Sequence, residues 1–181
     1  MTTTTFGFDA QQDRIWMRVH ERETTIWFTR RLMGQFLGPV VQAFEQATPG
    51  AVGGSPPAQR AAIEHDLSLH EAPAGQRVPQ IRAGRVTPSP GANPQQGLCT
   101  RVATRTGQEM VTMTFDTPTG PLVLPLTRRG MHLWLKGLSM VVRQAHWGLP
   151  LALPDWLEAG VMPSALQALV DKPVDPDGTR T

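Results

Sequence analysis

Arginine and tryptophan alternate along residues 14–18, and of all the patterns in the chain this one is best suited to binding chemistry. Residues 14–20 alternate strictly, which is typical of a β-strand with two different faces. Ile15, Met17 and Val19 share one face, and cations lie beside indole rings on the other. Single-stranded nucleic acid is bound by this combination, because cations contact phosphates and rings stack on bases. A face covered by the C-terminal segment or by a second subunit, or a solvated face with arginines lying over the rings, are the alternatives.

Two further arginine pairs each follow a threonine that is placed to cap a helix, Thr29 and Thr127. Cations at the start of a helix oppose the helix dipole, so a structure usually avoids them there. We therefore include both pairs among the candidate binding residues. The residues predicted to bind a partner are Arg14, Trp16, Arg18, Trp27, Arg30, Arg31, Arg101, Arg105, Arg128 and Arg129.

The remaining polar clusters do not form a recognisable active site. His65 and His70, beside Glu64, Asp66 and Glu71, are five positions apart, whereas two metal ligands on one helix face need a spacing of three or four. We interpret this cluster as a solvated helix face and predict no metal site. We also predict no catalytic residues, no cofactor and no enzymatic activity, because no glycine-rich phosphate loop, nucleophile elbow or paired carboxylate is present. We likewise assign no catalytic role to three isolated candidates, because none has a partner at catalytic spacing: His132, His146 and Cys99.

The elements that must position these residues are two stretches in which an apolar strand leads directly into an amphipathic helix. Residues 26–45 and 122–147 share an alternating run, the sequence Thr-Arg-Arg, and a helical stripe of apolar residues. The polar side of the second helix carries His132, Lys136, Ser139 and Arg143, which we expect to be exposed. The repetition predicts an internal duplication of a β-β-α unit.

Strand pairing follows from matching the apolar faces. A turn near residues 21–22 pairs Trp16 with Trp27 and Met17 with Ile26. In the second half, a turn at residues 118–120 pairs Phe115 with Leu122, and a turn at residues 106–107 pairs Val102 with Val111. The predicted fold class is α+β, with one antiparallel sheet of about five strands and two helices packed on one face.

The chain is long enough for one compact domain with a proper core. Within it we expect a first unit at residues 1–47, a linker with a weak helix at 48–79, and a second strand meander and helix at 80–148. A docking C-terminal segment at 149–171 and a disordered tail at 172–181 complete the prediction.

Composition limits the function classes. The net charge of +2 is far from the strongly basic balance of most nucleic-acid-binding domains. No apolar run reaches the ~18 residues of a membrane span, and the beginning of the chain has no signal-peptide pattern. Cys99 is the single cysteine, which fits a reducing compartment, so we expect a cytoplasmic protein.

We therefore expect a non-catalytic binding or assembly protein, an accessory subunit that acts through an Arg/Trp-lined sheet face. Its partner would be another protein or a second copy of this chain, and no membrane is involved. The alternative is a single-stranded nucleic-acid-binding protein that uses the same face.

Overall fold

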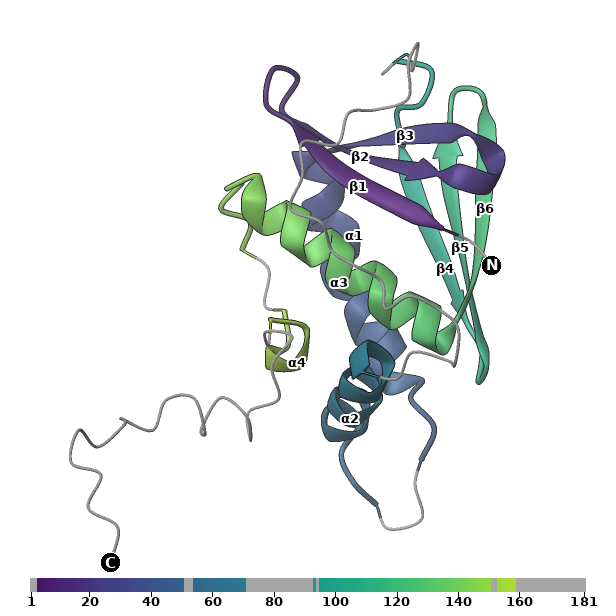
Figure 1. Cartoon of the computed structure of the whole chain (residues 1–181), viewed down its shortest axis with the longest axis vertical. Coiled ribbons are helices and arrows are strands. Elements are labelled where there is room, and N and C mark those ends of the chain that lie inside the picture. The colour runs from purple at the N-terminus through teal and green to yellow at the C-terminus, as the bar shows by residue number, and fades with distance from the viewer. Residues whose placement is uncertain (1–2, 51–53, 71–92, 94, 151–152, 159–181) are drawn as a thin grey trace, which may run out of the picture.

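The computed structural model describes residues 3–50, 54–70, 93, 95–150 and 153–158. In chain order its main elements are β1 (Thr4–Asp9), β2 (Arg14–Val19), β3 (Thr24–Thr29), α1 (Arg30–Gln46), α2 (Pro57–His70), β4 (Arg101–Thr106), β5 (Met110–Thr117), β6 (Gly120–Thr127), α3 (Arg128–Gln144) and α4 (Asp155–Glu158). The fold class is α+β, as predicted. The strands, however, form two antiparallel sheets of three strands each, ordered β1-β2-β3 and β4-β5-β6, in place of one sheet of about five (Figure 1).

The third strand of the first sheet is β1, which the sequence analysis did not predict. Its two phenylalanines explain why it is held in place. Phe6 packs edge-on against Trp134 with ring centroids 5.5 Å apart, and Phe8 packs in the same way against Trp147 at 5.9 Å. The aromatic contacts with α3 and the segment after it therefore hold β1 beside β2.

Two of the three predicted strand registers are confirmed. Trp16 pairs with Trp27 across β2 and β3, and Phe115 pairs with Leu122 across β5 and β6. The β4–β5 register is wrong by four residues, since Val102 pairs with Phe115 and not with Val111. The turn there lies two residues later than predicted, because a 2.8 Å hydrogen bond from the Gly107 N–H to the Met110 carbonyl closes it around residues 108–109 instead of 106–107. A shift of an even number of residues keeps the same side chains on the same face.

The two long helices begin at the predicted threonine caps. The hydroxyl of Thr29 accepts the Leu32 N–H at 3.2 Å, and the hydroxyl of Thr127 accepts the Gly130 N–H at 3.0 Å. Each helix follows the last strand of its own sheet and also packs on the other sheet, because α1 contacts β4 and α3 contacts β1. The inner faces of both sheets therefore close on one shared core, in which Phe28 and Phe115 meet with ring centroids 5.8 Å apart.

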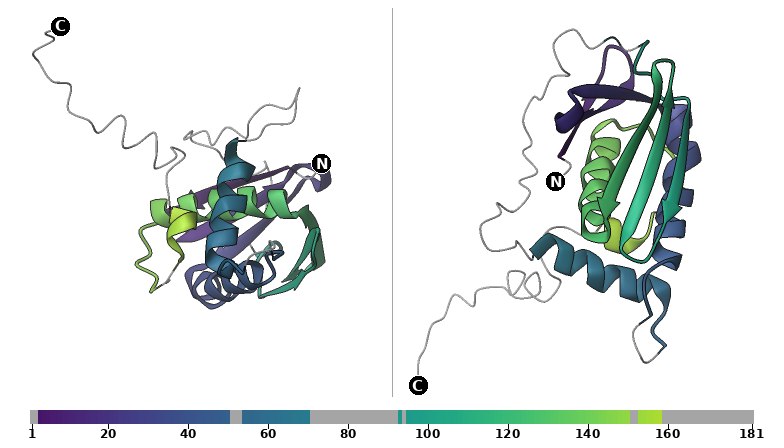
Figure 2. Two further views of the ribbon diagram at one scale, coloured as in Figure 1. Left: turned by 90° about the horizontal axis from the view of Figure 1, so that it is seen from below. Right: turned by 90° about the vertical axis from the view of Figure 1, so that its right-hand side faces the viewer.

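Among the described residues, an isolated parallel bridge between Trp27 and Leu98 joins β3 to the segment that precedes β4. Trp27 donates its N–H to the Gly97 carbonyl and accepts the Cys99 N–H, both at 2.8 Å. Helix α2 lies across the lower ends of α1 and α3, and α4 lies against α2 and α3 (Figures 1 and 2). Residues 71–92 and 159–181, including the predicted tail at 172–181, lie outside the described residues.

Candidate functional site: a buried charge cluster and an open sheet face

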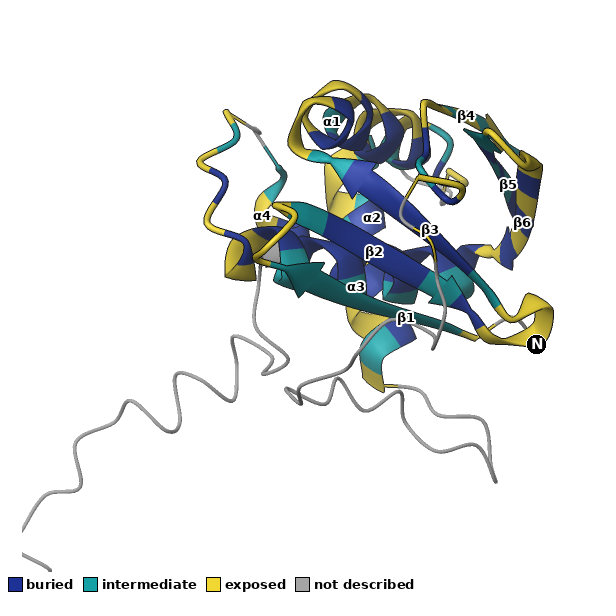
Figure 3. Cartoon of the chain, turned by 90° about the horizontal axis from the view of Figure 1, so that it is seen from above, coloured by how far each residue is buried: buried dark blue, intermediate teal, exposed yellow. Residues whose placement is uncertain are grey.

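The two tryptophans of the predicted binding face are buried. Trp16 and Trp27 each retain 1% of their accessible surface, and β2 and β3 are buried along most of their length (Figure 3). The Trp16 ring lies across β1 at Gly7, where a Cβ atom would overlap it. The ring of Trp27 lies against Gly97, with a Cβ there only 3.2 Å from Cδ1. The expected apolar patch is therefore covered by the protein's own chain. The glycine in the Phe6-Gly7-Phe8 strand was the one signal for this in the sequence.

The two arginines beside Trp16 are half-buried. Arg14 Nη1 and Arg18 Nε are both inaccessible to solvent and have no hydrogen-bond partner among the described residues. The remaining predicted arginines do not join them on one surface. Arg30 and Arg31 are exposed at the start of α1, while Arg101 and Arg105 are exposed on β4 in the other sheet.

The outer face of the second sheet is open to solvent. Alternate residues of β5 and β6 are buried toward α1 and α3, and no described helix covers the opposite side (Figure 2, right). Three rows of cross-strand neighbours form this face: Arg101 with Asp116 and Pro121; Ala103 with Thr114 and Val123; and Arg105 with Thr112 and Pro125. We call these nine residues the outer sheet face. Arg101 is ion-paired there, with its Nε 2.6 Å from the Asp116 carboxylate.

The last predicted pair, Arg128 and Arg129, faces α2. Arg128 Nε and Nη2 each lie 2.7 Å from an oxygen of Glu64, which is the paired geometry of a strong arginine–carboxylate contact. The same guanidinium donates to the Thr48 hydroxyl at 3.0 Å and to the Ala47 carbonyl at 3.2 Å. Because Arg128 is nearly buried and four of its five N–H donors are engaged in these contacts, it is poorly available to an external ligand.

Arg128 belongs to a larger charge cluster. His132 lies one turn further along α3, with Nε2 3.3 Å from Glu64, near enough for charge interaction but outside hydrogen-bond geometry. On its other side, His132 Nδ1 lies 3.2 Å from Nδ1 of His65 on α2. Trp156 of α4 covers both imidazoles, with ring centroids 5.0 Å from His65 and 5.7 Å from His132. We call Glu64, His65, Arg128 and His132 the charge cluster.

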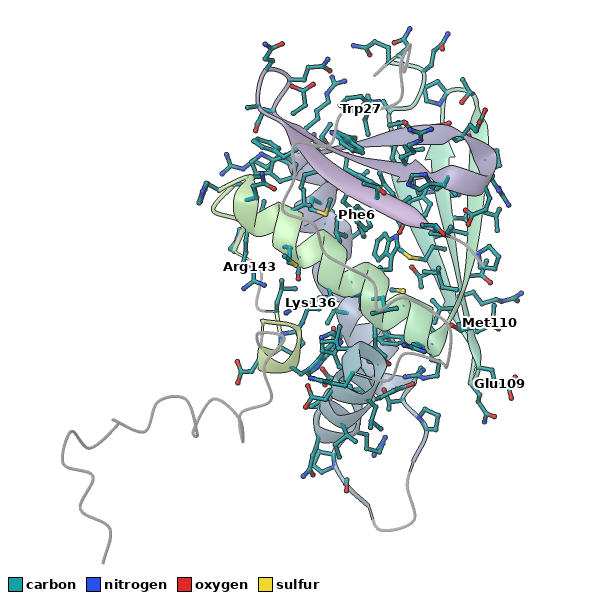
Figure 4. The ribbon with its side chains drawn as sticks, viewed as in Figure 1. Phe6, Trp27, Glu109, Met110, Lys136 and Arg143 are labelled. Carbon is teal, nitrogen blue, oxygen red and sulfur yellow. The ribbon has the colours of Figure 1, made fainter. Side chains whose placement is uncertain are left out.

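Lys136 extends this polar surface of α3 by a further turn. It is 2% exposed and donates to the Leu157 carbonyl at 3.4 Å, on the side of α3 that faces α4 (Figure 4). Ser139, one turn beyond, is also buried. The prediction that this side of α3 is exposed was therefore wrong for His132, Lys136 and Ser139, because α2 and α4 cover it; Arg143 is exposed, as predicted. The interpretation of residues 64–71 as a solvated helix face was likewise wrong for His65, which is fully buried.

Burial and charge both displace the protonation equilibria of the charge cluster. Burial alone would raise the pKa of Glu64, but the interactions with His132 and Arg128 outweigh it and lower that pKa from 4.5 to about 2. Burial lowers the pKa of His65 from 6.5 to about 3, and the positive charges of His132 and Lys136 act in the same direction. Burial also lowers the pKa of His132, although Glu64 opposes that shift. The carboxylate is therefore ionised and the imidazoles are neutral at physiological pH.

The Cys99 thiol is buried in the core. Burial raises the pKa of the Cys99 thiol to about 12, so it is not a thiolate nucleophile. No group of three or more histidine, cysteine, aspartate or glutamate side chains in the described parts could hold a metal ion. A hollow of about 490 Å³ lies between the β2–β3 and β5–β6 turns, but two of its hydroxyls, those of Thr24 and Thr119, already donate to the carbonyls of Arg22 and Gln96.

Comparison with known proteins gives no relative: no protein-family model, no curated protein and no solved structure matches this chain. Among the described residues, no helix has both the length and the apolar character needed to cross a membrane.

Proposed function

We propose that this chain is a non-catalytic binding or assembly protein of the cytoplasm and that its contact surface is the outer sheet face. The observation that supports the proposal is the difference in burial between the two faces of the second sheet. The inward side chains of β5 and β6 are buried and those of β4 are half-buried, whereas the outer face presents small apolar, threonine and proline side chains with no described element over them. Val123, at the centre of β6, is 39% exposed, and Met110, at the tip of the sheet, is 44% exposed.

This surface has the composition of a protein contact. Its middle row is Ala103, Thr114 and Val123, with charge confined to the β4 side and to Asp116. Apolar centres with polar rims are typical of protein interfaces. The prolines at positions 121 and 125 lack the N–H that a further strand would need, which disfavours addition of a strand at the β6 edge and favours a partner that packs on the face.

The alternative, a single-stranded nucleic-acid-binding protein, has less support. Stacking platforms need exposed rings. Trp16 and Trp27 are buried, and the exposed large apolar side chains of the described residues are Ile63, Leu67, Met110 and Val123, none of them aromatic. The arginines that remain exposed would supply charge without stacking.

Site-specific photo-crosslinking tests the proposal. A benzophenone amino acid at position 103 should form a covalent adduct in host cells, and at position 42, an exposed site on α1, it should not. An adduct of twice the chain mass identifies a second copy, and any other protein adduct identifies a different partner. Equal labelling at positions 103 and 42 would contradict the proposal, and so would an adduct to nucleic acid at position 103.

We also propose that the two halves are copies of one unit, which comprises three strands and a helix instead of the two strands and a helix predicted from sequence. In support, each half runs through an antiparallel three-stranded meander into a 17-residue helix that begins with two arginines after a capping threonine. A failure of residues 4–46 to superimpose on residues 101–144 would contradict this proposal.

A further inference from the structure

Helix α2 is attached to the rest of the molecule mainly through polar contacts. Its buried residues are Ala61, His65 and Ser68, whereas Ile63 and Leu67 are 56% and 51% exposed. A helix that buries so little apolar surface gains little from the hydrophobic effect when it docks. Elements of this kind separate from a fold at a lower free energy than its core strands.

The contacts that hold α2 to α3 depend on protonation. Glu64 must be ionised to bind Arg128 through both oxygens. The Nδ1 atoms of His65 and His132, 3.2 Å apart, can form a hydrogen bond only if one carries a proton and the other offers a lone pair. Two charged imidazoles would direct two N–H groups at each other. The observed contact therefore excludes the state in which both histidines are protonated.

The tautomers follow from the surroundings. With Nε2–H directed toward Glu64, neutral His132 accepts at Nδ1, so His65 donates from its own Nδ1. The Nε2 of His65 is then unprotonated, and neither this atom nor His132 Nε2 has a hydrogen-bond partner among the described residues.

The charged groups around the imidazole pair come from three packed helices. Glu64 of α2 lies beside His132, and Arg128 and Lys136 of α3 flank the pair. Glu45 of α1 accepts the Trp156 indole N–H at 3.3 Å on the far side of the covering ring. Of the other charged residues of α2 and α4, Asp66 and Asp155 are exposed to solvent. Among the described side chains, Glu64 is the carboxylate beside the pair that stabilises a positive charge on it, and Arg128 already engages both of its oxygens.

We propose that the contact between His65 and His132 is a proton-controlled clamp, which holds α2 on α3 when at least one imidazole is neutral and releases it when both are charged. Release of α2 from the fold then takes up two protons below the ordinary histidine pKa of about 6.5. The opening equilibrium constant should therefore increase as the pH falls, with a slope approaching two protons, and loss of one imidazole should reduce the slope to one.

Hydrogen exchange of the full chain, followed by mass spectrometry at pH 6 and pH 5 and corrected for intrinsic rates, measures this slope. Between those values we expect the protection of residues 57–70 to fall by about fifty- to a hundredfold, and that of residues 110–117 in β5 to fall much less. Below pH 5 the carboxylate of Glu64 would begin to contribute, so the window ends there.

The decisive variant is His65→Asn, because the amide can replace Nδ1 as donor or acceptor but does not titrate. Its α2 protection should fall only about tenfold at most over the same interval. The matched control is His70→Asn on the exposed end of the same helix, which should retain the wild-type slope. The β5 peptide reports whether each variant is folded. Equal slopes in wild type and His65→Asn, or equal loss of protection in α2 and β5 of the wild type, would overturn the proposal.

Discussion

Glu64 of α2 and Arg128 of α3 are 64 residues apart in sequence, yet two hydrogen bonds of 2.7 Å join them side by side. The arginine side chain is 8% exposed and the glutamate 27%. The guanidinium carbon of Arg128 also lies 4.5 Å above the ring of Phe44 on α1. This one pair therefore connects three helices at the lower end of the molecule.

Removal of one partner of this pair should be costly. Arg128→Ala leaves an ionised carboxylate without its counter-charge, and we expect the free energy of unfolding to fall by about 3 to 5 kcal/mol. Arg101→Ala removes the ion pair between Arg101 and Asp116, whose arginine is exposed, and should cost about 1 kcal/mol or less. Urea unfolding at pH 7 measures both values, and equal costs would show that the Glu64 pair contributes no more than a surface ion pair.

Acid should destabilise the protein in two stages. The folded-state pKa of His65, about 3, is below its ordinary value, so its contribution is fully present above about pH 6.5 and is lost as the pH falls toward 3. The pKa of Glu64 is lowered to about 2, so its contribution is present above about pH 4.5 and is lost below. Urea unfolding at pH 7 and pH 4.5 should differ by about 2 to 3 kcal/mol from His65 alone. Constant stability between pH 7 and pH 4.5 would contradict neutral burial of the imidazole.

Truncation of the tryptophans should unfold the protein and not merely change a surface. Trp16 and Trp27 are both buried, and replacement of either by alanine should cost about 3 to 5 kcal/mol. Gly7→Val should destabilise the fold by the opposite route, because the new side chain overlaps the Trp16 ring. Val123→Ala on the outer sheet face is the control and should change the free energy of unfolding by less than about 0.5 kcal/mol. A melting temperature unaffected by Trp16→Ala would mean that the rings are exposed.

The two helix caps should contribute equally if the halves are copies of one unit. Thr29→Ala and Thr127→Ala should each lower the free energy of unfolding by about 1 kcal/mol, because each leaves one backbone N–H of the first turn unsatisfied. Thr→Ser at either site retains the hydroxyl and should restore most of the loss. Thermal unfolding of the four single variants makes the comparison, and a cap that tolerates alanine would show that its helix is fixed by packing alone.

The local features of the fold could be predicted because their causes are local. The threonine caps depend on residues three positions apart, and alternation along β2 and β3 fixed Trp16 opposite Trp27. The same reasoning failed for the β4–β5 register, since a turn displaced by two residues keeps the same side chains on the same face and the apolar alternation does not distinguish the two positions. It also missed β1, whose attachment depends on Trp134 and Trp147, more than a hundred residues away.

By itself, the sequence determined which side chains share a face: the apolar stripes of α1 and α3 and the inner faces of both sheets follow from periods of 3.6 and 2 residues. Only the tertiary structure decided what lies over the other faces. The indole of Trp16 is covered because Gly7 leaves space for it, and the polar side of α3 is buried because Glu64 neutralises Arg128 from a helix 64 residues away. Complementarity of this kind is a property of two surfaces in contact, and it cannot be inferred from the sequence periodicity of either segment.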